Sequence, residues 1–179
     1  MSVPTNPRLS MTDIHKAFGS TQALAGVDLE VQAGEVLALV GENGAGKSTL
    51  MKILSGALRA DRGKMVLEGE EYNPQTPHQS REHGVAMIYQ ELSLAPHLTV
   101  VENIFLGRDQ SRFGWLQKEA ENTVAREALK RVGAEDIPLQ KKIASLNPAQ
   151  RQLVEIARAL AGDAKVIVMD EPTSSLTQL

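Results

Sequence analysis

The feature that most constrains this sequence is a glycine-rich segment behind a short apolar run. The run from Val36 to Val40 has the length of a buried strand, and Gly41 ends it. Residues 41–49 then read G-E-N-G-A-G-K-S-T, which matches the pattern G-x-x-x-x-G-K-S. Glycines let the backbone fold around an anion with its N–H groups pointing inward, and a helix beginning near Lys47 adds positive potential. The pattern therefore predicts a strand, a phosphate-binding loop and a helix, in that order.

Individual residues of this loop have separate predicted roles. Lys47 supplies a mobile positive charge for the β- and γ-phosphates of a nucleotide, and the hydroxyl of Ser48 is placed to bind Mg²⁺. The residues expected to line the nucleotide are Gly41, Glu42, Asn43, Gly44, Ala45, Gly46, Lys47, Ser48 and Thr49. The alternative is a glycine-rich turn that matches the pattern by accident, and the predicted strand and helix on either side argue against it.

A second apolar run ends in two carboxylates. Val166 to Met169 reads as a buried strand, and Asp170 and Glu171 follow it directly. Ligands of doubly wound sheets bind at the carboxyl ends of strands, so Asp170 is placed to hold the Mg²⁺ that Ser48 also contacts. Glu171 is suited to polarise a water for attack on the γ-phosphate. Acidic residues are common at strand ends, so this signal becomes strong only together with the phosphate loop.

Strand signals dominate the first ninety residues. The expected strands lie at residues 9–14, 27–31, 64–68 and 85–89. The first two alternate loosely between apolar and polar residues and flank a glycine-containing segment, so they are expected to form an antiparallel layer. A short helix is expected to end at residues 81–83.

Beyond Gln90 the signals change from strands to helices. Thr99 and Glu102 form a capping box that opens one helix. A second helix is expected over 117–132 and a third over 147–161, where Asn147 is the cap and Pro148 takes the first helical position. The expected inward face of the second helix consists of Ala120, Val124, Ala128 and Val132.

These elements predict an α/β fold with a P-loop NTPase core. We expect the core to comprise residues 1–91 and 151–179, with an antiparallel β layer at its N-terminus, and the helical insertion to comprise residues 92–150.

Composition limits the partners and the location of the protein. The 179 residues are 42 % hydrophobic and 23 % charged, which fits one globular domain with a real core. A formal net charge of −3 and the lack of a polybasic run give no electrostatic case for binding nucleic acid or lipid head groups. The apolar runs are only strand-sized and there is no cysteine. We therefore expect a cytoplasmic protein that reaches a membrane only through a partner.

Together these motifs resemble the ATP-binding subunits of ABC transporters, and the resemblance covers nearly the whole chain. It includes Tyr89-Gln90-Glu91 at the family's glutamine loop, E-P-T after the acidic strand, and residues 174–177 at the family's D-loop. Residues 88–108 and 154–160 resemble more narrowly the ribose, galactose and xylose uptake group. In that group one polypeptide usually carries two such domains in tandem, and this chain would be the first.

The resemblance implies further residue roles. It places Gln90 in the Mg²⁺ shell as a sensor of the γ-phosphate, and it makes Gln90, Lys47 and Glu171 the catalytic residues. It also places Phe18 against the adenine of ATP. A buried core phenylalanine is the alternative for Phe18, because stacking needs only one ring face and leaves no local motif.

The resemblance also implies partners and a location. The partners are a second ATPase domain, in tandem or in a dimer, and a membrane-spanning permease on which the helical insertion docks. A periplasmic sugar-binding protein would be an indirect partner. The expected location is peripheral, on the cytoplasmic face of the bacterial inner membrane.

Two departures from the family pattern stand out. The family's signature Leu-Ser-Gly-Gly-Gln, which caps the γ-phosphate bound by the opposing domain, is here Leu146-Asn147-Pro148-Ala149-Gln150. This segment either still reaches the opposing nucleotide or serves only as a helix start, since Asn147 and Pro148 suit the first turn. The family's switch histidine lies some tens of residues after the acidic strand, beyond Leu179, so we expect a domain that is incomplete at its C-terminus.

The favoured interpretation is an ATP-binding and ATP-hydrolysing subunit that energises import of a sugar or related polyol, with the 179 residues alone inactive. One alternative is a regulatory ABC domain that binds nucleotide with weak or no hydrolysis. Another is a non-transport ABC protein acting on ribosomes or DNA, for which basic segments are expected and none is visible.

Overall fold

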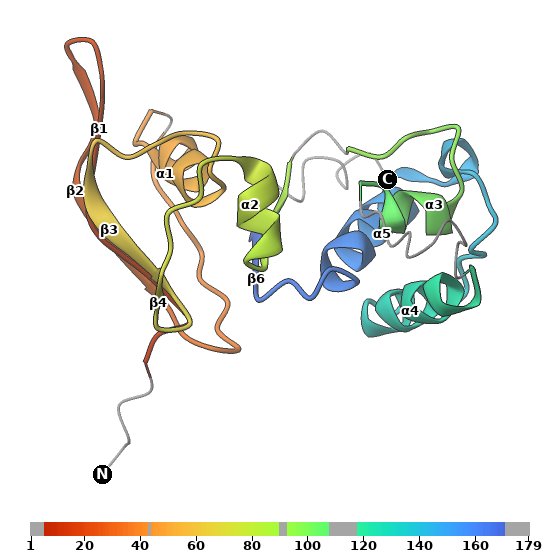
Figure 1. The fold of residues 1–179 in the computed structure, drawn as a ribbon. Helices are drawn as coiled ribbons and strands as arrows, with labels where there is room; N and C mark the ends of the chain where they lie inside the picture. Colours follow the sequence, from red (N-terminus) through yellow and green to blue (C-terminus); the bar gives the residue numbers. More distant parts are fainter. Residues whose placement is uncertain (1–5, 43, 90–92, 108–117, 171–179) are drawn as a thin grey trace. The chain divides into compact units, whose positions relative to one another are not determined.

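A computed structural model describes residues 6–42, 44–89, 93–107 and 118–170 (Figure 1). The chain divides into two compact units, Met1–Ala86 and Met87–Leu179, and each is described by itself. Within the described ranges, no helix is both long enough and apolar enough to cross a membrane.

The first unit is built on an antiparallel sheet in the order β2-β1-β3-β4. The strands are β1 (Leu9–Phe18), β2 (Thr21–Val31), β3 (Arg62–Leu67) and β4 (Glu70–Glu71). Leu9, Met11 and Ile14 of β1 are buried. The predicted antiparallel layer is therefore confirmed, with longer strands than the sequence indicated.

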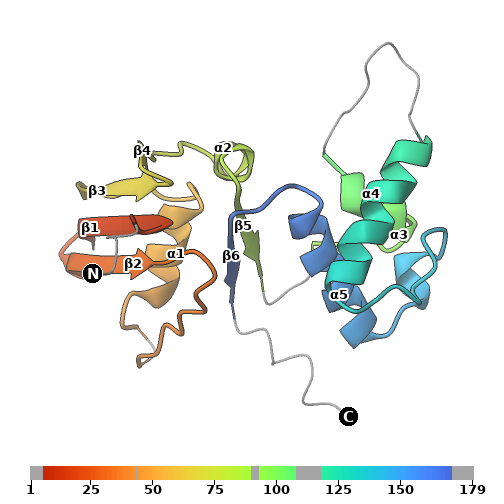
Figure 2. The same ribbon diagram turned by 90° about the horizontal axis from the view of Figure 1, so that it is seen from below.

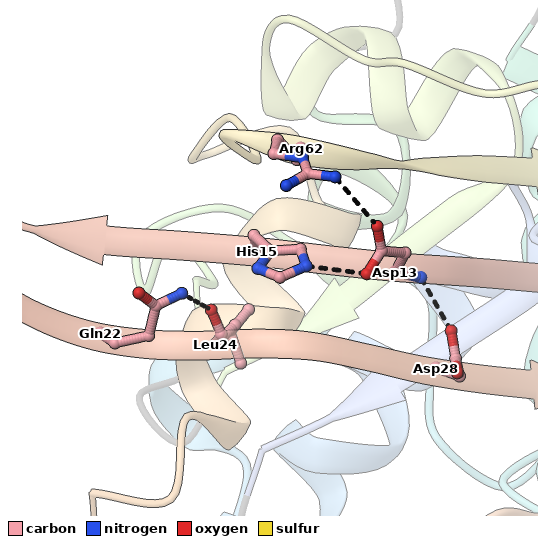
Figure 3. Close-up of polar contacts among 6 residues, drawn as sticks. All are labelled: Asp13, His15, Gln22, Leu24, Asp28 and Arg62. Carbon is pink, nitrogen blue, oxygen red and sulfur yellow. Dashed lines mark hydrogen bonds and ion pairs between the residues drawn. The ribbon is translucent and has the colours of Figure 1, made fainter.

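An irregular stretch interrupts β1 between Met11 and Ile14. Asp13 takes a left-handed conformation there, with φ of 52°. Its backbone N–H donates to Asp28 Oδ1 at 2.7 Å, and its carboxylate lies 2.7 Å from His15 Nε2 and 3.7 Å from Arg62 Nη2 (Figure 3). The polar contacts of Asp13 thus hold the irregularity in place across three strands.

Helix α1 (Lys47–Leu54) lies beside this sheet in both views (Figures 1 and 2). Its buried residues are Leu50, Ile53 and Leu54, as its apolar spacing predicts. The hydroxyl of Tyr72, which is itself buried, donates to Leu54 O at 2.7 Å and fixes the C-terminal end of the helix. The short helix expected before residue 83 is α2 (Pro77–Glu82).

The strand predicted for Val36–Val40 is wrong. These residues belong to neither sheet of the described chain, and Val36 and Val40 are 96 % and 90 % exposed. An apolar run supplies side chains for a buried strand, but a strand also requires the hydrogen bonds of a paired neighbour. The described residues provide no such pairing for this run.

Strands β5 (Val85–Ile88) and β6 (Val166–Met169) form a two-stranded sheet. The division between the two units falls within β5, after Ala86. Both strands were predicted. The burial expected for β6 is only partial, and Met169 is exposed.

The other described elements of the second unit are helices. They are α3 (Val100–Phe105), α4 (Lys118–Arg131), the short 3-10 helix η1 (Ile143–Ser145) and α5 (Pro148–Leu160). The capping box predicted at Thr99 and Glu102 is present at the start of α3. One hydrophobic core joins these helices: Val100, Val101, Ile104, Ala125, Ala128, Leu129, Ala134, Ile137, Leu139, Ile143, Leu146, Val154 and Ala157.

The inward face predicted for α4 needs correction. Ala128 is buried as predicted and Val132 packs against the core, but Ala120 and Val124 are exposed, Val124 to 42 %. The other buried residues of the helix are Ala125 and Leu129. The predicted stripe followed strict four-residue spacing and omitted Leu129, the one leucine of α4. Packing against α3 and α5 selects the face that buries this leucine.

Candidate functional site

The predicted phosphate-binding loop has the backbone conformation that its glycines permit. Gly44 and Gly46 have φ of 89° and 87°, a region that side chains disfavour. Ala45 N donates to Glu42 O at 3.1 Å, and Gly46 is the N-cap of α1. The loop therefore turns directly into a helix whose first N–H groups are available to an anion.

Gly46 is also required by a close approach to β2. A Cβ at this position would lie 2.6 Å from Ala23 O and 2.7 Å from Leu24 Cδ2, whereas a Cβ at Gly44 would meet nothing within 4 Å. The two glycines thus share a backbone conformation and differ in their surroundings.

Lys47 folds back over the loop that precedes it. Its Nζ donates to Gly41 O at 2.5 Å and to Glu42 O at 2.8 Å. Ser48 and Thr49 follow in the first turn of α1, and Ser48 is exposed. The structure thus places a positive charge, a hydroxyl and a helix N-terminus within one short segment.

Phe18 ends β1 and is 49 % exposed, so the alternative of a buried core phenylalanine is wrong. The Nζ atom of Lys16 lies over its ring, 5.7 Å from the centroid. Lys16 Nζ also donates to Asp61 Oδ1 at 2.7 Å. An exposed aromatic face held beside an ammonium group is suited to stacking on a planar base.

Asp170 lies at the end of β6, as predicted, and its N–H donates to Ile88 O at 3.0 Å. It belongs to the second unit and the phosphate loop to the first. The predicted site residues Asn43, Gln90 and Glu171 lie outside the described residues.

The segment at residues 147–150 forms the helix start that the sequence predicts. Asn147 Oδ1 accepts from Gln150 N at 2.8 Å, Gln150 Oε1 accepts from Asn147 N at 3.3 Å, and Pro148 takes the first position of α5. Arg151 Nε donates to Leu146 O at 2.9 Å and anchors the preceding turn. The two cap side chains thus bond to each other's backbone at the exposed start of the helix.

Sequence reasoning missed a charged pair further along α5. Glu155 is only 8 % exposed, and its Oε2 has no hydrogen-bond partner among the described residues. Burial raises the pKa of Glu155, and Arg158 opposes this effect from 4.0 Å. Arg158 also donates to Ser93 O at 3.1 Å and Leu106 O at 3.2 Å. The signal available in the sequence was a pair of opposite charges three residues apart within an otherwise apolar helix face.

Comparison with known proteins gives consistent matches. The ABC transporter family model matches residues 24–174. The chain is 47 % identical over 171 residues to the ribose import ATP-binding protein RbsA of Bacillus licheniformis, covering 95 % of this chain and 34 % of that protein. It is 51 % identical over 166 residues to the RbsA of Rhodopirellula baltica, covering 92 % and 32 %. The chain thus spans about a third of the length of these curated relatives.

Solved structures of ATP-binding cassettes share the α/β fold of this chain. An ATP-binding cassette of an ABC transporter in an ADP conformation is 31 % identical with a TM-score of 0.80, covering 95 % of this chain and 70 % of that one. A dimeric ATP-binding cassette with ADP and phosphate bound, in a post-hydrolysis state, is 27 % identical with a TM-score of 0.74, covering 93 % and 75 %.

Proposed function

Since this chain belongs to the ABC transporter family of ATP-binding domains, we propose that it binds Mg·ATP and hydrolyses it to energise import of a sugar or related polyol. The observation that carries the proposal is the phosphate loop. Its left-handed glycines, the ammonium group of Lys47 and the N-terminus of α1 lie within residues 41–50. This combination suits the triphosphate of a nucleotide.

In this proposal the phosphates replace backbone carbonyls as partners of Lys47. The N–H groups of the loop and of the first helical turn bind the phosphate oxygens, and Lys47 Nζ turns from Gly41 O and Glu42 O to the β- and γ-phosphates. Phe18 stacks on the adenine, for which its half-exposed ring is available. The remaining loop residues, Asn43 among them, line the nucleotide.

The proposed Mg²⁺ ligands are Ser48, Asp170 and Gln90. Ser48 is an exposed hydroxyl at the start of α1 and Asp170 follows β6, so the described donors are the hard oxygen ligands that Mg²⁺ prefers. When bound, the metal neutralises charge on the β- and γ-phosphate oxygens. Gln90 would complete the shell and sense the γ-phosphate.

Glu171 is the proposed general base. Its position directly after Asp170 puts a second carboxylate next to the proposed metal ligand, where it polarises the attacking water. Lys47 stabilises the charge that develops on the transferred phosphoryl group. In this proposal Glu171 activates the water and Lys47 stabilises the phosphoryl group.

The proposed assembly contains a second ATPase domain, in tandem or in a dimer, and a membrane-spanning permease. A periplasmic sugar-binding protein would deliver the substrate to the permease. In this arrangement residues 1–91 and 151–179 form the nucleotide-binding core, residues 92–150 dock on the permease, and the protein is peripheral on the cytoplasmic face of the inner membrane. The names of the curated relatives, which specify ribose import, support a sugar as the cargo.

A regulatory domain with weak hydrolysis is the second candidate. The observation that favours it is the segment Asn147-Pro148-Ala149-Gln150, where Asn147 and Gln150 already bond to each other's backbone. Because these two side chains take part in the cap of α5, fewer of their polar groups can bind a nucleotide on an opposing domain.

The test of the proposed function compares Lys47→Ala with Lys52→Ala in the full-length protein. Both substitutions remove one positive charge from α1, but Lys52 lies in its last turn. We expect Lys47→Ala to lose most of the Mg·ATP affinity in calorimetry and Lys52→Ala to retain it. Equal affinity in the two variants would contradict the phosphate-loop assignment.

The second experiment separates nucleotide binding from hydrolysis through Glu171→Gln. This change preserves the size of the side chain and removes the base, so ATP should stay bound while phosphate release stops. A mutant that hydrolyses ATP at the unmodified rate would show that Glu171 is not the base.

A further inference from the structure

One carboxylate ties the end of β1 to the loop before β3. Asp61 Oδ1 accepts from Lys16 Nζ at 2.7 Å, Asp61 Oδ2 accepts from Ala17 N at 2.7 Å, and Asp61 N donates to His15 O at 2.9 Å. Three consecutive residues of β1 are thus bonded to a residue more than forty positions away in sequence. The hydrogen bonds from Lys16 and Ala17 lower the pKa of Asp61, so the carboxylate is ionised at neutral pH.

This contact fixes an ammonium group beside an aromatic ring. Lys16 lies two residues before Phe18, and its Nζ lies over the ring, 5.7 Å from the centroid. The Lys16 side chain is largely shielded from solvent, whereas Phe18 remains half exposed. A lysine on a strand normally samples many rotamers, but the bond to Asp61 restricts this one to the position over the ring.

The position of the Lys16 ammonium group affects the orientation of the Phe18 ring. A half-exposed phenylalanine at a strand end has little packing to select its rotamer, and a cation over one face favours a single orientation. The opposite face is then the one that a planar base would use. A ring that is already oriented loses less entropy when a base stacks on it.

We propose that Asp61 and Lys16 are positioning residues for the adenine base: Asp61 holds the Lys16 ammonium over Phe18, and the ammonium holds the ring as a stacking platform. This inference rests on the proposed function, in which Phe18 stacks on adenine. It adds two residues that touch neither the phosphates nor the base.

The experiment compares two probes, Mg·ATP and Mg·tripolyphosphate, in calorimetry of the full-length protein. Tripolyphosphate uses the phosphate loop and lacks the base, so it separates the platform from the rest of the site. The test variants are Asp61→Asn, which keeps an acceptor for Ala17 N, and Lys16→Met, which keeps the apolar stem. The control is Arg8→Gln, which breaks another exposed ion pair of the first unit, between Arg8 just before β1 and Glu68 just after β3, at 2.9 Å.

We expect each test variant to bind ATP about two- to fivefold more weakly, the effect of losing one exposed cation–π contact. Tripolyphosphate affinity should not change, and Arg8→Gln should change neither affinity. In a Phe18→Ala background, Lys16→Met should have no further effect, because the two residues act on the base as one unit. Equal weakening for both probes, or an unchanged ATP affinity, would overturn the proposal.

Two further outcomes separate this inference from the proposed function. If wild-type protein bound ATP and Phe18→Ala had no effect, the platform would be refuted while the phosphate site stood. If wild-type protein bound neither probe, the proposed function would fall and this inference with it. Should Asp61→Asn reduce the unfolding temperature too far for calorimetry, Lys16→Met and Lys16→Gln provide the same comparison without touching Ala17.

Discussion

The two left-handed glycines of the phosphate loop offer a matched test of how the loop is held. Gly44 and Gly46 have nearly the same φ, 89° and 87°. Giving an L side chain this conformation costs about 1–2 kcal/mol at either position. At Gly44 a Cβ would meet nothing within 4 Å, so Gly44→Ala should cost only this backbone term.

At Gly46 a second cost is added. The new Cβ would lie 2.6 Å from Ala23 O and 2.7 Å from Leu24 Cδ2, and the carbonyl is part of the backbone of β2. Relief requires the strand or the loop to shift, which typically costs about 1–3 kcal/mol. Gly46→Ala should therefore destabilise the region by about 2–5 kcal/mol in total.

Hydrogen exchange of the α1 amides measures this difference in the full-length protein, because local opening reports local stability. We expect α1 to exchange much faster in Gly46→Ala than in Gly44→Ala. A third variant, Gly34→Ala, carries the same backbone penalty outside the loop. The φ of Gly34 is 77°, and a Cβ at this position would meet nothing within 4 Å. Equal protection of α1 in the Gly44 and Gly46 variants would refute the close approach to β2.

Three other predictions concern the second unit. Burial raises the pKa of Glu155 above its ordinary value of 4.5, and Arg158 opposes this shift. The folded protein therefore retains a proton that the unfolded chain releases. The free energy of unfolding should fall as the pH rises from 4.5 through the raised pKa of the folded state. Glu155→Gln should flatten this dependence in urea unfolding, and an unchanged slope would implicate another group. Leu129→Ala should lower the free energy of unfolding by about 2–5 kcal/mol, whereas Val124→Ala on the exposed side of the same helix should lower it little. Equal shifts of the unfolding midpoint in the two variants would show that Val124 is buried as the sequence predicted. Asn147→Ser with Ala149→Gly should raise the ATPase activity of the full-length protein if the altered signature limits turnover, and flat activity would contradict that role.

The helix starts follow from local sequence patterns. The capping box at Thr99, the cap at Asn147 and the start of α1 at Lys47 all lie where the sequence predicts them. The caps at Thr99 and Asn147 depend on side chains three residues apart, and the start of α1 depends on the left-handed Gly46 before it, so the chemistry of a short segment is sufficient. The family resemblance rested on the same kind of local pattern and is confirmed by the family match.

Other features depend on residues that are distant in the sequence and meet only in the folded chain. The apolar run at residues 36–40 could not specify a strand, because pairing comes from another segment. The buried face of α4 depended on which side chains α3 and α5 could accommodate around Leu129. The contact of Asp61 with Lys16 and Ala17 left no sequence pattern at all, since the chain had to bring together residues 44 and 45 positions apart. Periodicity and spacing describe neighbours along the chain, and these contacts exist only once the chain has folded.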